Sequence, residues 1–343
     1  MSQHNTDEEY QAHILIGVSR TFALTIPQLP LPLSKVVSNA YLLCRIADTI
    51  EDEPNLTPTQ KREFSQEFIQ VVAGESNPEI LSKNLFPLFS DSTLEAEKDL
   101  ILNMPRVIRL THDFTEEQQA TLLRCVSIMV TGMAEFQQNS SLEGLKDLDE
   151  LERYCYHVAG VVGEMLTDLF CDYSPQMAEN KKELQLLAIS FGQALQLTNI
   201  IKDLWEDQQR GVCWLPRDVF KELGFDLKHL TPGHPAFAEG LSILVGVAHT
   251  HLHNALHYTL LIPSHEKGIR RFCLWALGMA ILTLRRINRR LDFSEGKQVK
   301  ISRRSVKATI LISNLFTSND TALQMLFDLI TRPLPISCLK KII

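Results

Sequence analysis

Several features are scarce in this chain of 343 residues, and their scarcity narrows the choice of fold. Glycine and proline number 15 each, which is too few for a fibrous or low-complexity protein. Alternating apolar and polar runs closed by Asn-Gly turns, the strongest local sign of β-hairpins, are missing. Hydrophobic residues make up 45 % of the chain and charged residues 22 %, which is enough apolar material for a sizeable core. The composition therefore disfavours a disordered chain and a β-sheet protein.

Cysteine pairs and long apolar runs are also missing. The seven cysteines are scattered through apolar stretches without a Cys-x-x-Cys pair, which is typical of reduced, buried thiols in a cytosolic protein. The polar, acidic start Met1–Tyr10 does not resemble a signal peptide. The best candidate for a membrane span, Phe272–Leu284, has 13 residues, short of the roughly 20 that a spanning helix needs. We therefore expect a cytoplasmic protein without a transmembrane anchor.

The net charge of −7 is unevenly distributed. The segment His265–Lys307 holds twelve Lys and Arg residues against three acidic residues. A basic segment in an acidic protein fits a phosphate-bearing ligand or an anionic membrane surface, and a solvated helix face is the alternative. Few aromatic residues are interleaved with these cations and the whole chain is acidic, so we expect no nucleic-acid partner.

Helical periodicity dominates the chain. The stretch Ala73–Asp91, which contains two prolines, is expected to be a loop or a pair of short helices. No linker and no fixed-period repeat divides the chain, so we predict one all-α domain over residues 1–343 with roughly a dozen helices. The long helices are predicted at Leu33–Glu53, Thr115–Gln138, Leu148–Phe170, Lys181–Gln209, Ala236–Leu261 and His265–Leu291.

Two predicted helices carry a pair of aspartates four residues apart, Asp48 with Asp52 and Asp203 with Asp207. This spacing places both carboxylates on one helix face, where they repel each other by a few tenths of a kcal/mol. Mg²⁺ prefers such oxygen ligands and completes its coordination with water and phosphate oxygens. One such pair alone most often marks a solvated acidic face. Two pairs, each within an apolar helix, indicate two carboxylate-bearing helices that hold Mg²⁺ and a diphosphate in an internal cavity.

Four stretches of the chain resemble the squalene and phytoene synthases, the head-to-head prenyl synthases. They occur in the family's order over about residues 17–217: Ser19–Ala23, Tyr41–Asp52 (YLLCRIADTIED), Tyr154–Gly163 (YCYHVAGVVG) and Asn199–Pro216 (NIIKDLWEDQQRGVCWLP). The resemblance implies a single-domain isoprenoid-synthase helical bundle with a central cavity.

Within this family the chain looks more like a squalene synthase than a phytoene synthase. The run Glu206–Gln209 resembles squalene synthases, and so does Gly296–Arg304, where the family has a Val-Lys-Ile-Arg-Lys segment in a flap that contacts NADPH. Lys300 and Ile301 match this segment. Ser302 replaces the arginine, whose charge Arg303 or Arg304 would supply. The resemblance thus implies a basic cofactor flap within residues 265–310. The C-terminal anchor of eukaryotic members is missing, so we expect a bacterial-type member, soluble or peripheral on the inner face of the membrane.

The resemblance also assigns roles to individual residues. It implies Mg²⁺ ligands on both helices, substrate-binding residues around them, basic residues for the NADPH phosphates, and a tyrosine that serves the first half-reaction. Arg210 and Arg217 are further candidates for phosphate contact. The catalytic set is Tyr154, Asp48, Asp52, Asp203 and Asp207; the metal set is Asp48, Glu51, Asp52, Asp203 and Asp207; the substrate set is Ser19, Arg20, Phe22, Tyr41, Arg45, Asn199 and Arg210; the cofactor set is Arg20, Arg45, Lys202, Lys300 and Arg303.

The expected activity is that of a prenyltransferase of sterol or hopanoid biosynthesis, with Mg²⁺ and NADPH as cofactors. Two farnesyl diphosphates would join head to head through presqualene diphosphate to squalene, in an apolar site that keeps water from the carbocations. One alternative is an NADPH-independent member that makes dehydrosqualene, presqualene diphosphate or phytoene. Another is a non-catalytic lipid-binding or assembly protein on the same fold. A class I terpene cyclase fits less well, because its second metal motif usually mixes Asn, Ser or Thr with Glu.

Three other signals carry less weight. His249, His253 and His257 recur every fourth residue with His251 between them, which could form a metal site but more often marks structural histidines. Gly160 and Gly163 would either leave room for an isoprenoid chain or permit close helix packing. The cations at the two ends of Phe272–Leu284 are candidates for contact with anionic lipid: Arg270, Arg271, Arg285 and Arg286.

Overall fold

A computed structural model describes residues 6–19 and 21–337 of the chain. Within these ranges the regular structure is helical, apart from one isolated β-bridge between Leu145 and Pro216. The predicted all-α class is therefore confirmed. Five of the six long helices predicted from periodicity are present as single helices, and the sixth, Leu148–Phe170, is interrupted by a π-helical turn at Tyr156–Gly160. Ala73–Asp91 contains the pair of short helices that its prolines indicated.

The contacts between residues divide the chain into two compact units, and each is described by itself. The first unit consists of residues 1–138 and 168–173, and the second of residues 139–167 and 174–343. The first unit contains α1 (Asp7–Val18), α2 (Phe22–Thr25), η1 (Ile26–Gln28), α3 (Leu31–Asp52), α4 (Pro58–Val72), α5 (Pro78–Leu85), η2 (Phe86–Leu88), α6 (Glu95–Leu102), α7 (Met104–His112) and α8 (Glu116–Gln138).

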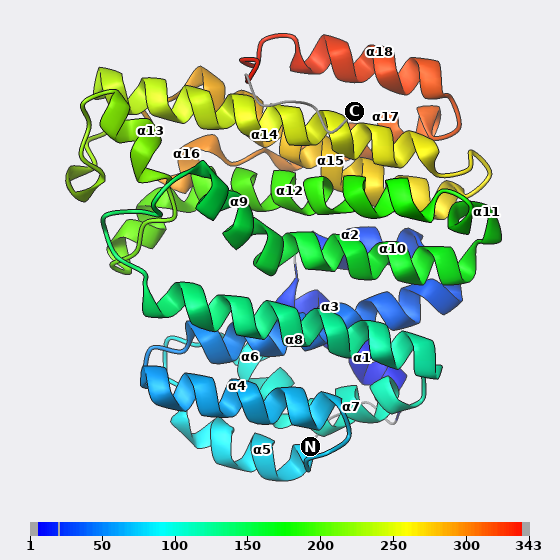
Figure 1. The fold of residues 1–343 in the computed structure, drawn as a ribbon. Helices are drawn as coiled ribbons and strands as arrows, with labels where there is room; N and C mark the ends of the chain where they lie inside the picture. The colour runs from blue at the N-terminus through cyan, green and yellow to red at the C-terminus, as the bar shows by residue number, and fades with distance from the viewer. Residues whose placement is uncertain (1–5, 20, 338–343) are drawn as a thin grey trace. The chain divides into compact units, whose positions relative to one another are not determined.

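The second unit contains the longest helices of the chain. They include α12, α14 and α15, which pack on one another (Figure 1). The helix α10 begins in the second unit, and its last residues, from Asp168, belong to the first. The elements are α9 (Leu148–Cys155), η3 (Tyr156–Gly160), α10 (Val161–Tyr173), α11 (Pro175–Ala178), α12 (Lys181–Gln209), α13 (Arg217–Glu222), η4 (Leu227–His229), α14 (Pro235–Leu261), α15 (Lys267–Arg289), α16 (Gly296–Val299), α17 (Arg303–Phe316) and α18 (Asp320–Thr331).

The helix α3 is the centre of the first unit and packs against α1, α4, α6, α7 and α8. It starts directly after Pro30 with a second proline in its first turn, where the fixed φ of proline suits a helix start. Its buried side chains recur every three or four residues: Val36, Ala40, Leu43, Ala47 and Ile50 are each at most 1 % exposed. This apolar stripe holds α3 in the core of its unit and leaves the carboxylates of its last turns on the other faces.

The helix α12 is likewise the centre of the second unit, and α14 runs beside it in the opposite direction (Figure 1). Its end is set by Gly211, whose φ of 83° is a conformation that favours glycine. The amide of Gly211 donates to the Gln208 carbonyl oxygen at 3.0 Å, and the amide of Val212 donates to the Asp207 carbonyl oxygen at 3.1 Å. This Schellman-type ending fixes the last turn of α12 directly after the second aspartate pair.

By length and composition, one helix among the described residues could cross a membrane, and it is α12. However, 67 % of its apolar window is buried in the protein, and a core helix of a soluble protein passes the same test. The stretch Phe272–Leu284, which the sequence indicated is too short to span a membrane, lies in α15, and α15 does not meet this criterion. The apolar side chains of α15 are core residues, such as Leu274, Leu277 and Leu284.

The cysteines agree with the expectation of reduced, buried thiols. Of the six cysteines within the described ranges, all are free and five are buried, while Cys338 lies outside these ranges.

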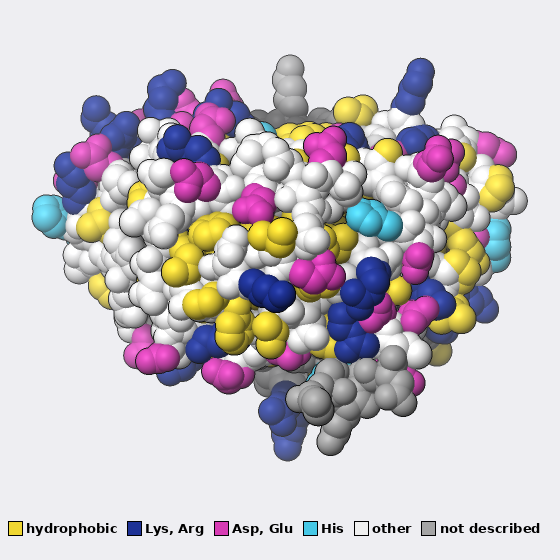
Figure 2. Space-filling model, turned by 90° about the horizontal axis from the view of Figure 1, so that it is seen from below, with side chains coloured by type: hydrophobic (Ala, Val, Ile, Leu, Met, Phe, Trp, Pro, Cys, Tyr) yellow, Lys and Arg dark blue, Asp and Glu magenta, His cyan; other side chains and the backbone are white. Residues whose placement is uncertain are grey.

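On the face shown in Figure 2, acidic and basic side chains alternate, with hydrophobic side chains gathered between them. The charge of −7 is therefore not concentrated on that face.

Candidate active site

Three carboxylates lie within the last two turns of α3: Asp48, Glu51 and Asp52. Burial raises the pKa of Asp48 to about 7, and the neighbouring charges of Asp52 and Glu97 add to the effect while Arg45 opposes it. Burial and the Asp52 carboxylate likewise raise the pKa of Glu51 to about 7. Carboxylates that destabilise one another's charge in this way would gain from a bound cation.

The side chain of Gln137, from α8, donates a hydrogen bond to the Glu51 carboxylate. Lys61, from α4, donates to the backbone carbonyl of the same residue. Both contacts come from neighbouring helices and fix Glu51 at the end of α3. Gln137 could not be identified from the sequence, because nothing in its neighbouring residues marks it as a site residue.

A second group in the first unit surrounds Arg45, one turn before Asp48. Its guanidinium donates to the Tyr41 hydroxyl at 2.9 Å and lies 3.7 Å from the Glu97 carboxylate. The Tyr41 hydroxyl in turn donates to the Val18 carbonyl oxygen at 3.1 Å. The buried Nε of Arg45 has no hydrogen-bond partner among the described residues. An arginine with a free, buried donor can still bind an anionic group such as a phosphate.

The segment before α3 contributes two more predicted residues to this group. Ser19 is buried, and its hydroxyl accepts a hydrogen bond from the Phe22 amide at 2.9 Å, which satisfies the first amide of α2. The ring of Phe22 lies 5.3 Å from the ring of Tyr41. The structure therefore brings Ser19, Phe22, Tyr41 and Arg45 together. Arg20, which was predicted to bind substrate and cofactor, lies outside the described residues.

The C-terminal half of α12 carries the second aspartate pair. Lys202 donates to the Asn199 side-chain oxygen at 2.8 Å, and its ammonium lies 3.0 Å from Asp203. Asp203 and Asp207 are partly exposed on successive turns, and Arg210 is exposed at the end of the helix. The predicted neighbours Asn199, Lys202 and Asp203 therefore form one polar group on one helix face. In contrast, Arg217 forms an ion pair with Glu143 at 2.7 Å.

Two residues between Asp203 and Asp207 bind a distant segment of the second unit. The indole of Trp205 donates to the Phe293 carbonyl oxygen at 2.8 Å, and the Glu206 carboxylate accepts from the Gly296 amide at 3.2 Å. Trp205 is a core residue, since it is 7 % exposed. The role of Glu206 could not be seen in the sequence, because an acid in the middle of an acidic run looks like one more charge.

Tyr154 lies near the end of α9 and stacks on Trp214, with ring centroids 4.3 Å apart and an interplanar angle of 10°. The chain then makes a π-helical turn, η3, whose Tyr156 hydroxyl donates to Glu164 at 3.1 Å. Such π-turns occur frequently at functional sites because they displace a side chain from the regular helical position. Trp214 fixes the plane of the Tyr154 ring, a role that spacing along the sequence did not show.

The glycines that follow Tyr154 permit close packing. A Cβ atom on Gly163 would lie 2.3 Å from the Ala188 carbonyl oxygen of α12. This distance is far below van der Waals contact, so only glycine fits there without a shift of the backbone. Of the two readings of this glycine, close helix packing is confirmed, and room for an isoprenoid chain stays a prediction.

The predicted flap residues Lys300 and Arg303 lie on either side of Ser302, at the start of α17, and both side chains are exposed. Ser302 caps this helix, since its hydroxyl accepts from the Ser305 amide at 3.1 Å. Neither cation forms an ion pair within the described part of the chain, so both can bind phosphate groups. Arg286 donates to the Lys300 carbonyl oxygen, which ties this segment to α15.

The donor sets fit the groups that the resemblance implies. Asp48, Glu51 and Asp52 would supply carboxylate oxygens on α3, and Asp203 and Asp207 would supply them on α12, and Mg²⁺ prefers such ligands. Within residues 6–19 and 21–337, no group of three or more His, Cys, Asp or Glu side chains is arranged to hold a metal alone. A magnesium ion would therefore need water and phosphate oxygens to complete its coordination.

The histidines of α14 have structural contacts. His251 hydrogen-bonds to Ser190 at 2.7 Å, and the His249 ring bonds to the Pro335 carbonyl oxygen at 2.9 Å. The His253 ring packs edge-on against Phe327 at 4.7 Å. These contacts favour the structural reading of the histidine series.

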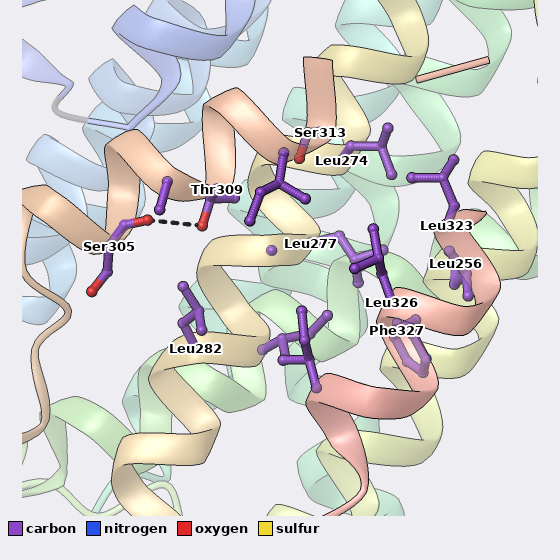
Figure 3. A pocket seen from close by; sticks show the side chains of 15 residues that line it. Leu256, Leu274, Leu277, Leu282, Ser305, Thr309, Ser313, Leu323, Leu326 and Phe327 are labelled. Atoms are coloured by element: carbon purple, nitrogen blue, oxygen red, sulfur yellow. Dashed lines mark hydrogen bonds between the residues drawn. The ribbon is translucent and has the colours of Figure 1, made fainter. Parts of the chain in front are cut away.

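An apolar groove of about 280 Å³ lies in the second unit between α14, α15, α17 and α18. Figure 3 shows Leu277, Leu326 and Phe327 directed toward the space between these helices, and Thr309 donates to the Ser305 carbonyl oxygen at one end. None of the predicted catalytic residues lines the groove. Its lining includes Leu256, Leu274, Leu277, Leu323, Leu326 and Phe327.

The helical architecture and the two carboxylate-bearing helices define the class of isoprenoid-synthase folds. The family model for squalene/phytoene synthase matches residues 15–305, and the chain belongs to this family. This confirms the family that four short motifs indicated.

Individual relatives agree with this assignment. Squalene synthase clz20 of Cochliobolus lunatus is 30 % identical over 243 residues, which cover 68 % of this chain and 55 % of that protein. The solved structure of TcSQS with a ligand has a TM-score of 0.76 at 22 % identity, covering 95 % of this chain and 91 % of that one. A dehydrosqualene synthase with a ligand has a TM-score of 0.64 at 21 % identity, covering 90 % and 96 %. At such identities the structures show a shared fold.

The chain spans 55 to 66 % of the length of the first curated relatives that it matches. Their activity as whole proteins therefore enters below as a proposal.

Proposed function

We propose that this protein joins two farnesyl diphosphates head to head and reduces the product to squalene, with Mg²⁺ and NADPH as cofactors. The observation that carries the proposal is the cluster of carboxylates at the end of α3, where burial and neighbouring carboxylates raise the pKa of Asp48 and of Glu51. It lies one turn after Arg45, whose buried Nε has no partner among the described residues. A cation site next to a guanidinium with one unused donor suits a diphosphate.

The residues of the chain have distinct tasks in this reaction. The two aspartate pairs, Asp48 with Asp52 and Asp203 with Asp207, would hold Mg²⁺, which supplies the Lewis-acid chemistry that lets diphosphate leave. Arg45 and Lys202 bind the departing negative charge. The 2,3 double bond of the second farnesyl group attacks the allylic cation that remains, and loss of a proton closes the cyclopropane of presqualene diphosphate.

Tyr154 is suited to the carbocation steps. Its ring face can stabilise a nearby cation, and the stack on Trp214 holds that face in one orientation. Its hydroxyl can orient the diphosphate or relay the proton that is lost. For the final reduction, Lys300 and Arg303 would bind the phosphates of NADPH, which supplies the hydride.

A product assay tests the proposal. Purified protein is incubated with farnesyl diphosphate and Mg²⁺, with and without NADPH, and the extract is analysed by mass spectrometry. We expect squalene only with NADPH, and presqualene diphosphate or dehydrosqualene without it. A C₃₀ or C₄₀ product that is independent of NADPH would move the protein to the alternative branch. No turnover of farnesyl or geranylgeranyl diphosphate would favour a non-catalytic lipid-binding protein.

A peripheral membrane contact belongs to this proposal, but with a different surface from the one the sequence indicated. Arg270 was wrong as a lipid contact, because it is 1 % exposed and donates to backbone carbonyls and to Asp320. The outer face of α17 is better suited. Arg304 and Lys307 occupy its first turns, and Leu311 and Leu315 follow on the same face at 71 % and 73 % exposure.

The partner that this face fits is an anionic lipid bilayer. The segment Gly296–Phe316 holds five cations and no acidic residue, in a chain with a net charge of −7. Cations beside exposed leucines are typical of helices that lie in the interface of a membrane. The apolar groove between α17 and α18 (Figure 3) adjoins this face. An inner-leaflet location and cytoplasmic exposure of the remaining surface would follow.

Cosedimentation with vesicles tests this contact. We expect the protein to bind anionic vesicles, made of phosphatidylcholine with roughly 30 % phosphatidylglycerol, more strongly than neutral vesicles. The double variant Leu311→Ser/Leu315→Ser should lose at least about tenfold in binding, whereas Leu186→Ser, an exposed leucine of α12, should lose none. Equal binding of both variants to anionic vesicles, or a dimer that the double variant abolishes, would count against a lipid partner.

A further inference from the structure

Glu206 connects the second aspartate pair to the predicted cofactor segment. It lies on α12 between Asp203 and Asp207, and its Oε1 atom accepts a hydrogen bond from the Gly296 amide at 3.2 Å. The other oxygen, Oε2, is buried and has no hydrogen-bond partner among the described residues. The Glu206 carboxylate thus binds the segment around Gly296, and it forms no ion pair with the described residues of its unit.

The same segment is held at two further points. The neighbouring Trp205 donates to the Phe293 carbonyl oxygen at 2.8 Å, and the Arg286 guanidinium donates to the Lys300 carbonyl oxygen. Phe293 and Val299 are fully buried between these points. We call residues 293–300 the strap, because both ends and the middle are tied to α12 and α15.

At Gly296 the backbone of the strap passes close to the backbone of α12. A Cβ atom there would lie 2.9 Å from the Glu206 Oε1 atom and 2.9 Å from the Lys202 carbonyl oxygen. The second of these neighbours is backbone of α12 and has little freedom to move. The absence of a side chain at residue 296 is therefore what allows the hydrogen bond to Glu206.

We propose that Glu206 is a positioning residue that holds the strap, and with it Lys300 and Arg303, in register with Asp203 and Asp207. The inference rests on the proposed function in one respect, namely that Lys300 and Arg303 bind NADPH. The inference assigns Glu206 to the reductive half-reaction, although the position of Glu206 within the acidic run suggests a metal ligand. Loss of Glu206 would then weaken NADPH binding and leave the first condensation nearly unchanged.

Hydrogen exchange of the ligand-free, full-length protein tests the strap without any activity. In Glu206→Ala, we expect the amides of residues 294–300 to exchange at least about tenfold faster than in the wild type, because the acceptor of the Gly296 amide is lost. In Glu206→Gln, the side-chain oxygen can still accept, so exchange should stay within about threefold of the wild type. Glu222→Ala, an exposed acid on α13, is the matched control and should change nothing.

Steady-state kinetics of the same variants separate a positioning role from a metal-binding role. We expect Glu206→Ala to raise the KM for NADPH about tenfold while the rate of presqualene diphosphate formation without NADPH changes less than about threefold. Gly296→Ala should behave in the same way, and Glu206→Gln should restore the KM.

Two results would overturn the inference. Unchanged exchange in Glu206→Ala would show that the carboxylate does not hold the strap. An equal loss of both half-reactions, with Glu206→Gln as impaired as Glu206→Ala, would place Glu206 among the metal ligands. If neither the wild type nor any variant turns over farnesyl diphosphate, the proposed function is wrong. The comparison of hydrogen exchange still decides whether Glu206 holds the strap.

Discussion

Asp48 illustrates how the site is built at the scale of a residue. Its carboxylate is held near Asp52 and Glu97 in a partly buried position, so its pKa rises to about 7, as does that of Glu51. In the unfolded chain both groups lose their protons near pH 4. Between these values the folded protein binds more protons than the unfolded chain, so stability falls as the pH rises from about 4 to about 7.

The variant Asp48→Asn removes one of these two charges. In the presence of EDTA we expect it to be as stable as the wild type at pH 4.5 and more stable by about 1–3 kcal/mol at pH 8. Urea unfolding at a series of pH values measures the difference. A constant offset between the two proteins over this range would contradict the raised pKa, and Asp218→Asn, an acid at the start of α13, serves as the control.

Asp203 belongs to the second aspartate pair, and its replacement is expected to lower the rate of the reaction and to leave the fold intact. We expect Asp203→Asn to lower turnover of farnesyl diphosphate at least about 100-fold, because an amide oxygen is a weaker ligand for Mg²⁺ and leaves charge uncompensated. The far-UV circular dichroism should stay unchanged. Near-normal turnover at saturating Mg²⁺ would remove Asp203 from the metal set.

Helix contacts decide the geometry at the scale of the element. Gly163 at the start of α10 faces the Ala188 carbonyl of α12 so closely that a methyl group does not fit. We expect Gly163→Ala to destabilise the protein by about 1–3 kcal/mol, although alanine favours the helix itself. Gly246→Ala on α14 is the control, since its nearest neighbour would be 3.3 Å away. Equal unfolding midpoints for the two variants would contradict the packing argument.

Arg270 joins several elements of the second unit. Its guanidinium donates to the carbonyls of Leu260, Ile262 and Thr317 and forms an ion pair with Asp320, so it connects the end of α14 with α15 and with the turn before α18.

The variant Arg270→Met keeps the bulk of the side chain but leaves three carbonyls without their donor. We expect a loss of about 3 kcal/mol or more in unfolding free energy, because each unsatisfied buried acceptor costs about 1–3 kcal/mol. Arg289→Met, at an exposed position of the same helix, should cost less than about 0.5 kcal/mol. A difference below about 1 kcal/mol in urea unfolding would show that Arg270 is dispensable for the fold.

Ligand binding gives a prediction for the whole molecule. Inorganic diphosphate with Mg²⁺ should stabilise the protein by about 2.7 kcal/mol at 100 times the dissociation constant, which raises the melting temperature by a few degrees. Neither component alone should do so, because the carboxylates need the metal and the metal needs phosphate oxygens. Asp48→Asn and Asp203→Asn should each abolish the shift in differential scanning fluorimetry. A shift that persists in both variants would place the diphosphate elsewhere.

Much of the site could be predicted because its residues are neighbours along a helix. The spacing of Asp48 with Asp52 follows from helical geometry alone. The partners of these residues could not be predicted, because Glu97 and Gln137 come from other helices and Trp214 comes from the loop after α12. The role of Glu206 was hidden for the same reason, since its partner Gly296 lies 90 residues away.

The sequence by itself determined the helical class, five of the six long helices and the family, because all three depend on periodicity and on short motifs within single segments. Tertiary structure alone decided which charges are buried, and hence that Asp48 and Glu51 ionise near pH 7, that Arg270 is a core residue and that Glu206 binds the strap. The physical reason is that solvation and hydrogen-bond partners are set by residues far away in the chain, whereas helix formation is set by neighbours.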